Sequence, residues 1–285
     1  MIEFRVKQDI IEVGKRMYDK GFVASNDGNI SARISEDRII ITPTGVSKGY
    51  MSEYDLITVD MQGNVVYGDK KPSSEIKMHL AVYRKRPDVK AIVHAHPPAA
   101  TAFAVANKNL DKITLPEVVF SLGNIAMAEY GTPSTDKIPM AVEKCIDRSD
   151  ALLLANHGAL TVGGDVMDAY YKMETLEHFA KISLYARLLG GERVLDEEET
   201  RELFRVRKEV YGRDNFLYAD KDTGDTESTD NRGSASDQIG GDVGAGEQSP
   251  PDNKSEPMVR STVIGHVEDA VKRLVMEEIK KSSLF

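Results

Sequence analysis

Two histidines one residue apart close an apolar run at residues 91–97, Ala-Ile-Val-His-Ala-His-Pro. Successive side chains on a strand point to opposite faces, so His94 and His96 point to the same side if this run is extended. The apolar residues before them are typical of a buried strand. The pattern therefore predicts two neighbouring imidazoles at the end of a core strand, an arrangement typical of metal ligands.

A second apolar run, residues 151–155, ends in Asn156, His157 and Gly158. Three histidines at the ends of two strands can supply three nitrogen ligands to a zinc-type ion and leave one coordination position open. That arrangement is expected of catalytic zinc rather than structural zinc. The alternative is that the first pair arises by chance and that His157 is an ordinary turn residue.

The composition favours a globular protein without covalent cross-links. The chain has 285 residues, 41% of them hydrophobic, which suffices for one large or two small domains. A single cysteine, Cys145, excludes an intrachain disulfide. No signal peptide and no apolar run of membrane length is visible, so we expect a cytoplasmic protein without a membrane partner. The net charge of −9 argues against nucleic-acid binding.

The chain divides into three parts, because its composition changes sharply after residue 219. Residues 220–257 contain ten acidic and three basic residues and very few apolar ones, so we expect a disordered acidic linker. Residues 258–285 carry apolar side chains at helical spacing and predict an amphipathic helix. Such a helix on a long tether is typical of a docking element, although it could also fold back onto the main domain, residues 1–219.

Periodicity and turn residues predict the elements of the main domain. We expect helices at residues 1–18, 72–86, 98–106, 138–145, 165–189 and 196–211. We expect strands at residues 38–42, 56–59, 65–67, 91–96 and 151–155, a turn feeding a strand within 25–34, and extended segments at 113–122. The short strands joined by tight turns favour antiparallel pairing. A serine at 73 or 74 is the expected N-cap of the helix that follows it.

Five motifs then occur in a recognisable order. They are Gly28-Asn29, Thr42-Pro43-Thr44-Gly45, Pro72-Ser73-Ser74-Glu75, His94-Ala95-His96 and His157-Gly158. Each motif alone is weak, but the five in register resemble the class II aldolase/adducin family, and within it the L-fuculose-1-phosphate aldolases. The resemblance covers about residues 1–215.

The resemblance implies a fold and a set of site residues. The fold would be α/β, in three layers, with a largely antiparallel central sheet flanked by helices, assembled as a homotetramer. His94, His96 and His157 would bind one Zn²⁺ per subunit, and Glu75 would be the catalytic acid/base. The substrate phosphate would be bound by Gly28, Asn29, Thr44, Gly45, Ser73 and Ser74.

The chemistry of these residue types agrees with that assignment. Breaking a carbon–carbon bond next to a ketone leaves an enediolate, whose charge a divalent cation stabilises as a Lewis acid. A carboxylate at the position of Glu75 can then move a proton to or from the enediolate carbon. The alternative for Glu75 is a glutamate favoured by the helix dipole. The phosphate motifs, taken singly, are ordinary turns and N-caps.

The chain departs from the family pattern at Pro116. Bacterial fuculose-phosphate aldolases have a tyrosine there, which acts as a second proton donor in the site of a neighbouring subunit. Glu117, Tyr130 and Tyr211 are the candidates to replace it, and the resemblance favours Tyr211. The remaining histidines, His79, His178 and His266, are predicted not to be metal ligands.

The resemblance implies cleavage of L-fuculose 1-phosphate to dihydroxyacetone phosphate and L-lactaldehyde, with L-rhamnulose 1-phosphate as a further substrate, in fucose or rhamnose metabolism. Two enzymes with a similar metal site are alternatives: a pentulose-phosphate 4-epimerase and a methylthioribulose-1-phosphate dehydratase. A non-catalytic adducin-like scaffold is a third, which loss of the metal ligands would indicate. The sequence retains all three histidines and Glu75.

The tail carries a second resemblance. A short amphipathic helix after a linker rich in Pro, Gly and Ser is similar to the encapsulation peptides that direct enzymes into bacterial microcompartments. This resemblance implies a shell protein as a partner for residues 258–285 and a location inside such a compartment. Any helix that docks in a groove has the same amphipathic pattern.

Overall fold

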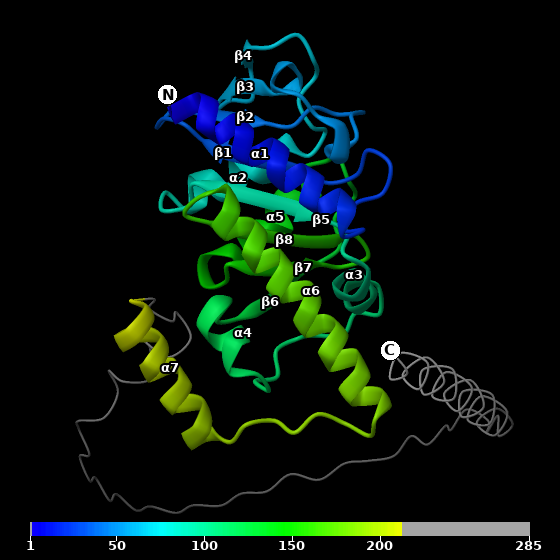
Figure 1. The fold of residues 1–285 in the computed structure, drawn as a ribbon, viewed down its shortest axis with the longest axis vertical. Coiled ribbons are helices and arrows are strands. Elements are labelled where there is room, and N and C mark those ends of the chain that lie inside the picture. The colour runs from blue at the N-terminus through cyan, green and yellow to red at the C-terminus, as the bar shows by residue number, and fades with distance from the viewer. Residues whose placement is uncertain (1, 213–285) are drawn as a thin grey trace, which may run out of the picture. The chain divides into compact units, whose positions relative to one another are not determined.

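The computed structural model describes residues 2–212, so the expected linker at 220–257 and the expected helix at 258–285 lie outside the described residues. The helices are α1 (Ile2–Asp19), α2 (Ile76–Lys85), α3 (Pro98–Val105), α4 (Pro116–Ser121), α5 (Lys137–Glu143), α6 (Val166–Leu188) and α7 (Glu197–Tyr211) (Figure 1). The strands are β1 (Asn29–Arg33), β2 (Arg38–Ile41), β3 (Ile57–Asp60), β4 (Val65–Tyr67), β5 (Ala91–Ala95), β6 (Ile125–Ala128), β7 (Ala151–Leu154) and β8 (Gly158–Gly163). None of the described helices combines the length and the apolar character needed to cross a membrane.

The eight strands form one sheet in the order β4-β3-β2-β1-β5-β8-β7-β6. Every neighbouring pair is antiparallel except β6 and β7, which run parallel. The predicted, largely antiparallel sheet is therefore confirmed. Strand β5 lies near the middle, where His94 pairs with Asn29 of β1 on one side and with Leu160 of β8 on the other.

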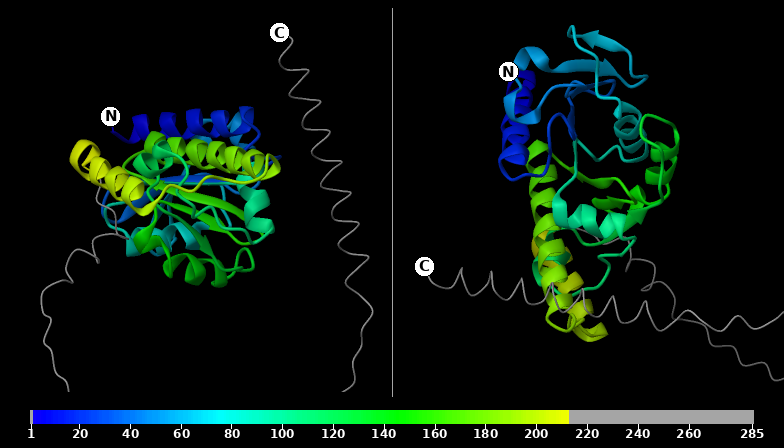
Figure 2. Two further views of the ribbon diagram at one scale, coloured as in Figure 1. Left: turned by 90° about the horizontal axis from the view of Figure 1, so that it is seen from below. Right: turned by 90° about the vertical axis from the view of Figure 1, so that its right-hand side faces the viewer.

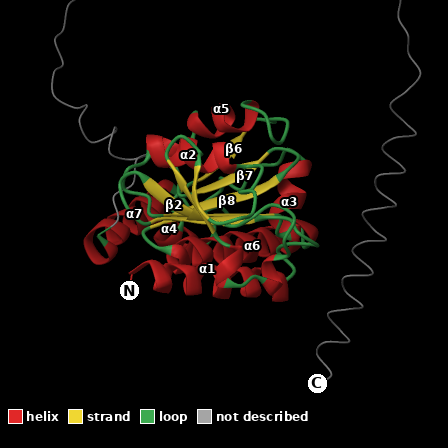
Figure 3. Cartoon of the chain, turned by 90° about the horizontal axis from the view of Figure 1, so that it is seen from above, coloured by secondary structure: helices red, strands yellow, loops and turns green. Residues whose placement is uncertain are grey.

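Helices cover both faces of the sheet and give three layers. Buried residues of α1, α3, α4 and α6 share one apolar core with one face of the sheet, and those of α2 and α5 share a second core with the other face. Figures 2 and 3 show the sheet between these two helical layers. On β2, Ile40 enters the first core and its neighbours Ile39 and Ile41 enter the second. A strand buried on both faces needs apolar residues throughout, which explains the continuous apolar runs.

The expected helices at both ends of the domain are present. In α1, Ile10, Val13 and Met17 are fully buried at helical spacing. Helix α6 begins after Asp165, whose side chain accepts the backbone N–H of Asp168. Helix α7 begins with a capping box between Asp196 and Glu199.

Two local predictions are wrong. Residues 116–121 form α4 and not an extended segment, with Pro116 at the first helical position, where its fixed φ and missing N–H are well tolerated. The expected serine N-cap of α2 is also absent, because the helix begins after Glu75. Ser73 instead accepts the backbone N–H of Glu75 through its Oγ, at 3.3 Å.

Candidate active site

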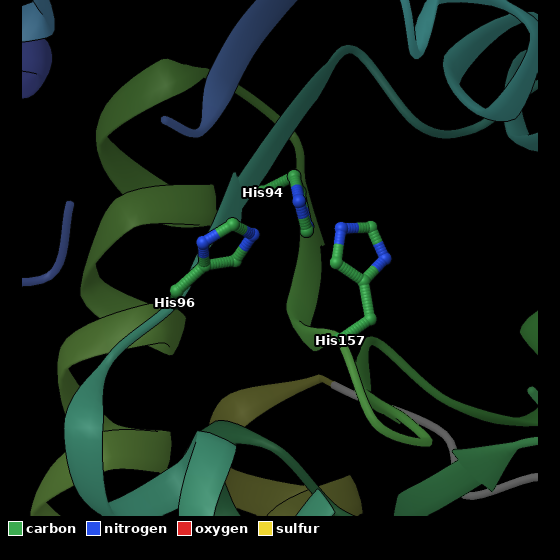
Figure 4. Close-up of side chains that lie close together, drawn as sticks. All are labelled: His94, His96 and His157. Atoms are coloured by element: carbon green, nitrogen blue, oxygen red, sulfur yellow. The ribbon is translucent and has the colours of Figure 1, made fainter. Parts of the chain in front are cut away.

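The two buried strands bring the three histidines together as their spacing predicts. His94 lies in β5, His96 directly follows it, and His157 lies in the turn between β7 and β8. The ring centroids are 5.1 Å apart for His94 and His96, 4.8 Å for His94 and His157, and 5.2 Å for His96 and His157. Figure 4 shows the three rings gathered around a common space. One nitrogen of each ring lies within 4.8 Å of the others, so the group can hold a metal ion.

The hydrogen bonds of the rings fit a bound divalent metal. The carbonyl oxygen of Ala159 accepts a hydrogen bond from the Nδ1–H of His94 at 2.8 Å, which leaves the lone pair on Nε2. Nε2 of His96 and Nδ1 of His157 are buried and have no hydrogen-bond partner among the described residues. Nε2 of His94 is also buried, and the Glu75 carboxylate lies 3.1 Å from it. Such atoms are unfavourable in a folded protein unless something binds them. Three imidazoles are also the ligand set of catalytic zinc sites.

The pKa values of two of the rings favour the unprotonated, ligating form. Burial lowers the pKa of His157 to about 4, assisted by repulsion from His94. Burial and the same repulsion lower the pKa of His96. Burial also opposes the charged form of His94, but the attraction of Glu75 outweighs it and raises the pKa of that ring.

The Glu75 carboxylate faces this cluster from the start of α2. Its Oε2 lies 3.1 Å from Nε2 of His94, and its Oε1 lies 3.3 Å from Nε2 of His157. Asn29 donates its amide N–H to Oε2 at 2.8 Å. Burial raises the pKa of Glu75, but the attraction of His94 and His157 and the hydrogen bond from Asn29 lower it well below its usual range. The side chain is therefore an ionised carboxylate beside the imidazoles.

The backbone around Gly28 fixes Asn29 in this position. Gly28 has φ +70°, a conformation that glycine adopts without strain. A Cβ at Gly28 would lie 2.6 Å from Cγ1 of Val23 and 2.9 Å from the carbonyl oxygen of His94. Because β1 pairs with β5 at this point, the glycine allows Asn29 to pack directly beside His94.

The three segments expected to bind phosphate lie next to one another. Pro43 and Pro72 form an isolated β-bridge, and the carbonyl oxygen of Thr42 accepts the backbone N–H of Ser73 at 3.1 Å. Thr44, Gly45 and Ser74 are exposed and Ser73 is buried. These contacts join the segment of Thr44 and Gly45 to that of Ser73 and Ser74.

Lys48 connects the segment of Gly28 and Asn29 to the segment of Thr44 and Gly45. Its Nζ donates to the carbonyl oxygens of Asn26 at 2.9 Å and Val46 at 2.7 Å. Lys48 is only 1% exposed, and the two hydrogen bonds satisfy two of the three N–H groups of its buried ammonium. The turn that contains Gly28 and Asn29 is therefore linked to the turn that contains Thr44 and Gly45.

The candidates for a second acid lie in different places. Tyr211 ends α7, and its ring stacks on Phe120 of α4 with centroids 5.1 Å apart and planes at 24°. Tyr130 is exposed after β6. Glu117 is exposed on α4 and lines an open cleft with Phe22, whose carbonyl oxygen accepts the backbone N–H of His96. The contacts thus unite Glu75, Asn29 and the three histidines, whereas Tyr211 contacts α4.

Two polar residues near the site were given no role in the sequence analysis. Oδ2 of Asp27 lies 3.4 Å from Nδ1 of His96. In the sequence, only the position of Asp27 in the turn before Asn29 indicated that it lies near the site. His79, predicted not to be a metal ligand, is fully buried and contacts Asn29 through a ring nitrogen. Its spacing of four residues from Glu75 on a helix was a signal that both side chains share one face.

Comparisons with known proteins agree with this geometry. The family described as Class II Aldolase and Adducin N-terminal domain matches residues 8–184. An L-fuculose phosphate aldolase from Methanocaldococcus jannaschii is 37% identical over 178 residues, which cover 62% of this chain and 95% of that protein. A 3-oxo-tetronate 4-phosphate decarboxylase from Haemophilus influenzae is 35% identical over 209 residues, which cover 71% of this chain and 98% of that protein.

A solved structure of an L-fuculose 1-phosphate aldolase is similar with a TM-score of 0.66 and 34% identity, covering 70% of this chain and 94% of the other. Sequence and structure therefore match such proteins over nearly their whole length. Since the family match spans more than half of this chain and includes every residue of the histidine cluster, the chain belongs to the class II aldolase and adducin family.

Proposed function

We propose that this chain is a metal-dependent lyase that cleaves L-fuculose 1-phosphate, and also L-rhamnulose 1-phosphate, to dihydroxyacetone phosphate and L-lactaldehyde. The observation that carries the proposal is the position of the Glu75 carboxylate, within 3.3 Å of two of the three clustered histidines. An acid/base group beside a metal site is what enediolate chemistry requires. The similarity to the fuculose phosphate aldolase of Methanocaldococcus jannaschii supports this substrate.

The residues of the chain have separate tasks in this reaction. His94, His96 and His157 would hold a divalent ion, which we propose is Zn²⁺, and when bound this ion supplies positive charge that stabilises the enediolate oxygens. When the carbon–carbon bond breaks, its electron pair remains on the ketone fragment. The ionised Glu75 takes up a proton from solvent, which balances the proton that the leaving hydroxyl loses, and delivers it to that carbon. Backbone N–H groups and hydroxyls at 28–29, 44–45 and 73–74 bind the phosphate.

A decarboxylase is the second candidate, and Pro116 favours it. Aldol cleavage needs a second group, which removes the proton from the hydroxyl of the leaving fragment. Loss of CO2 from a 3-oxo acid needs none, because the departing carboxylate carries no proton. Decarboxylation of 3-oxo-tetronate 4-phosphate leaves the same enediolate and, after protonation, gives dihydroxyacetone phosphate. The Haemophilus influenzae relative with this named activity covers 71% of this chain.

One assay distinguishes the candidates, because both reactions release dihydroxyacetone phosphate. The purified, zinc-loaded protein is incubated with each substrate, and the product is followed with a coupled NADH-dependent dehydrogenase, with and without a chelator. Chelator-sensitive release from L-fuculose 1-phosphate, with L-lactaldehyde as the second product, supports the aldolase. Release only from 3-oxo-tetronate 4-phosphate, with equimolar CO2, supports the decarboxylase. No release from a metal-loaded protein favours the epimerase or the dehydratase.

Two further proposals concern assembly. We propose that the chain forms a homotetramer, in which a neighbouring subunit supplies the second acid through Tyr211. We also propose that residues 258–285 bind a microcompartment shell protein and direct the enzyme into the compartment. Sedimentation measurements test the first proposal, and co-purification with shell proteins tests the second.

A further inference from the structure

A chain of buried hydrogen bonds runs from Glu75 into the core between β1 and α2. Asn29 Nδ2 lies 2.8 Å from Oε2 of Glu75, and Asn29 Oδ1 lies 2.5 Å from Nε2 of His79. The Oγ of Ser31 lies 2.6 Å from Nδ1 of His79 and 2.9 Å from the hydroxyl of Tyr83. The metal site is therefore connected to Tyr83 through three intermediate side chains.

The regular spacing of residues along α2 and β1 produces this chain of hydrogen bonds. His79 and Tyr83 lie four residues apart on one face of α2, and Glu75, directly before the helix, precedes His79 by four residues. Asn29 and Ser31 point to the same face of β1, because side chains two residues apart on a strand do so. Asn29, Ser31, His79 and Tyr83 are at most 3% exposed, so water does not replace their hydrogen bonds.

The Glu75 carboxylate determines which group donates and which accepts in each of these hydrogen bonds. An ionised Glu75 only accepts, so Asn29 must present its N–H and not its oxygen to Oε2. Asn29 Oδ1 then faces His79, whose Nε2 must carry the proton. Nδ1 of His79 consequently accepts, and the hydroxyl of Ser31 donates to it. Each partner therefore has one allowed role, and His79 is the Nε2–H tautomer.

The electrostatic surroundings keep His79 neutral. Burial and repulsion from His94 lower the pKa of His79 to about 3, although the charge of Glu75 acts in the opposite direction. A neutral ring has one donor and one acceptor nitrogen, which the hydrogen bonds to Asn29 and Ser31 require. Burial also raises the pKa of Tyr83, so its hydroxyl keeps its proton and can donate to Ser31.

We propose that His79 is a positioning residue for proton transfer, because its Nε2–H holds the Asn29 amide in the one orientation that donates to Glu75. This inference rests on the proposed role of Glu75 as the acid/base. Without the His79 donor, the Asn29 amide loses one of the two hydrogen bonds that fix its orientation, and its buried oxygen loses its donor. Glu75 then moves away from the position in which it reaches the enediolate carbon.

Two substitutions separate this role from simple packing. His79→Gln keeps an N–H donor near the position of Nε2, and His79→Leu removes it. We expect His79→Leu to lower kcat about 10- to 100-fold, the usual cost of losing a supporting hydrogen bond. The KM and the bound metal should stay at wild-type levels, and His79→Gln should recover most of the lost kcat. Equal losses in both variants, or loss of metal in either, would overturn the proposal.

A double substitution tests whether His79 acts through Glu75. In a Glu75→Gln background the new amide can donate to Asn29, so the orientation of Asn29 no longer matters. Residual exchange of the carbon-bound protons of dihydroxyacetone phosphate with solvent deuterium, measured by NMR, is the readout. His79→Leu should then cause no further loss. If His79→Leu lowers the exchange rate in this background as much as it lowers the rate of the wild-type protein, His79 is a purely structural residue.

A neutron crystal structure of the wild-type protein tests the proton positions without any substitution. We expect deuterium on Nε2 of His79 and on Nδ2 of Asn29 facing Glu75. Deuterium on Nδ1 of His79 overturns the proposal, even if the variants do not fold. If the wild-type protein cleaves none of the sugar phosphates, the proposed function fails, whereas the neutron structure still decides the direction of the hydrogen bonds.

Discussion

Nε2 of His94 and Oε2 of Glu75 lie 3.1 Å apart, although one belongs to a central strand and the other precedes a helix on one face of the sheet. The contact couples the charge of the carboxylate to the candidate metal ligands. Replacing either side chain therefore perturbs the other, but the two replacements affect metal binding and proton transfer differently.

The substitution His94→Ala should abolish both bound metal and turnover. It removes the fully buried ligand whose orientation the Ala159 carbonyl fixes, and two imidazoles bind a divalent ion far more weakly than three. Elemental analysis and the dihydroxyacetone phosphate assay measure the two effects. His178→Ala, at an exposed position on α6, is the matched control. Full activity in a metal-free His94→Ala protein would remove the proposed mechanism.

The substitution Glu75→Gln should leave the metal in place and lower kcat by about 10²- to 10⁴-fold, the usual contribution of general acid–base catalysis. The amide has nearly the same shape as the carboxylate but cannot take up the proton. Glu129→Gln, at an exposed position after β6, is the control and should retain wild-type turnover. An unchanged rate in Glu75→Gln would assign the proton transfer to another group.

The buried His79 should make the protein less stable in acid. Its pKa is lowered to about 3 in the folded state, whereas a histidine in an unfolded chain titrates near 6.5. Below pH 6.5 the unfolded chain therefore binds a proton that the folded chain does not, and the free energy of unfolding falls as the pH decreases. At pH 5 this amounts to about 2 kcal/mol relative to pH 7 or above.

Urea unfolding of the wild-type protein and of His79→Gln at pH 7 and pH 5, both without metal, isolates this contribution. The other histidines are common to both proteins, so their effects cancel in the comparison. Between pH 7 and pH 5, the unfolding free energy of the wild-type protein should fall by about 2 kcal/mol more than that of the variant. A difference independent of pH would mean that His79 is protonated in the folded state.

The substitution Gly28→Ala should destabilise the protein by more than Gly21→Ala does. Both glycines have φ near +70°, so alanine is strained by about 1 kcal/mol at either position. Only at Gly28 does the added Cβ also meet Val23 and the carbonyl oxygen of His94, whereas at Gly21 nothing lies within 4 Å. Thermal unfolding measures the difference, and equal effects would show that the backbone at Gly28 moves without cost.

Deletion of residues 258–285 should leave turnover in solution unchanged and abolish co-purification with microcompartment shell proteins. The family match ends at residue 184, well before the deleted segment. Fusion of residues 220–285 to a fluorescent protein provides the complementary measurement, because the fusion should bind the shell without the catalytic domain. Loss of catalysis on deletion would indicate that the segment folds back onto the main domain.

Six of the eight strands and the histidine cluster could be predicted because their signal is local, whereas β6 and β8 were missed. The run that ends at His94 and His96 specifies both a buried strand and the side to which the rings point. Helix α4 was missed because the residue pattern around Pro116 fits an extended segment as well as a first helical turn. The parallel pairing of β6 and β7 has no local signal, since it depends on which strands meet after the chain has folded.

The hydrogen-bonded chain behind Glu75 was only half visible in the sequence. The spacing of Glu75, His79 and Tyr83 on one helix face could be read directly, as could that of Asn29 and Ser31 on one strand face. Their meeting depends on how α2 packs on β1, which no short segment encodes. The same reasoning applies to Asp27, whose contact with His96 depends on the pairing of β1 with β5.

The central position of β5 has a kinetic consequence for metal exchange. His94 belongs to a strand that is paired on both edges and buried on both faces, so its amide opens to solvent only when the centre of the sheet opens. His157 lies in a turn, and His96 lies beyond the end of the strand. An ion held by all three would therefore be released through motion of the His157 and His96 side, while His94 keeps its place. Amide hydrogen exchange in β5 should accordingly be among the slowest in the domain.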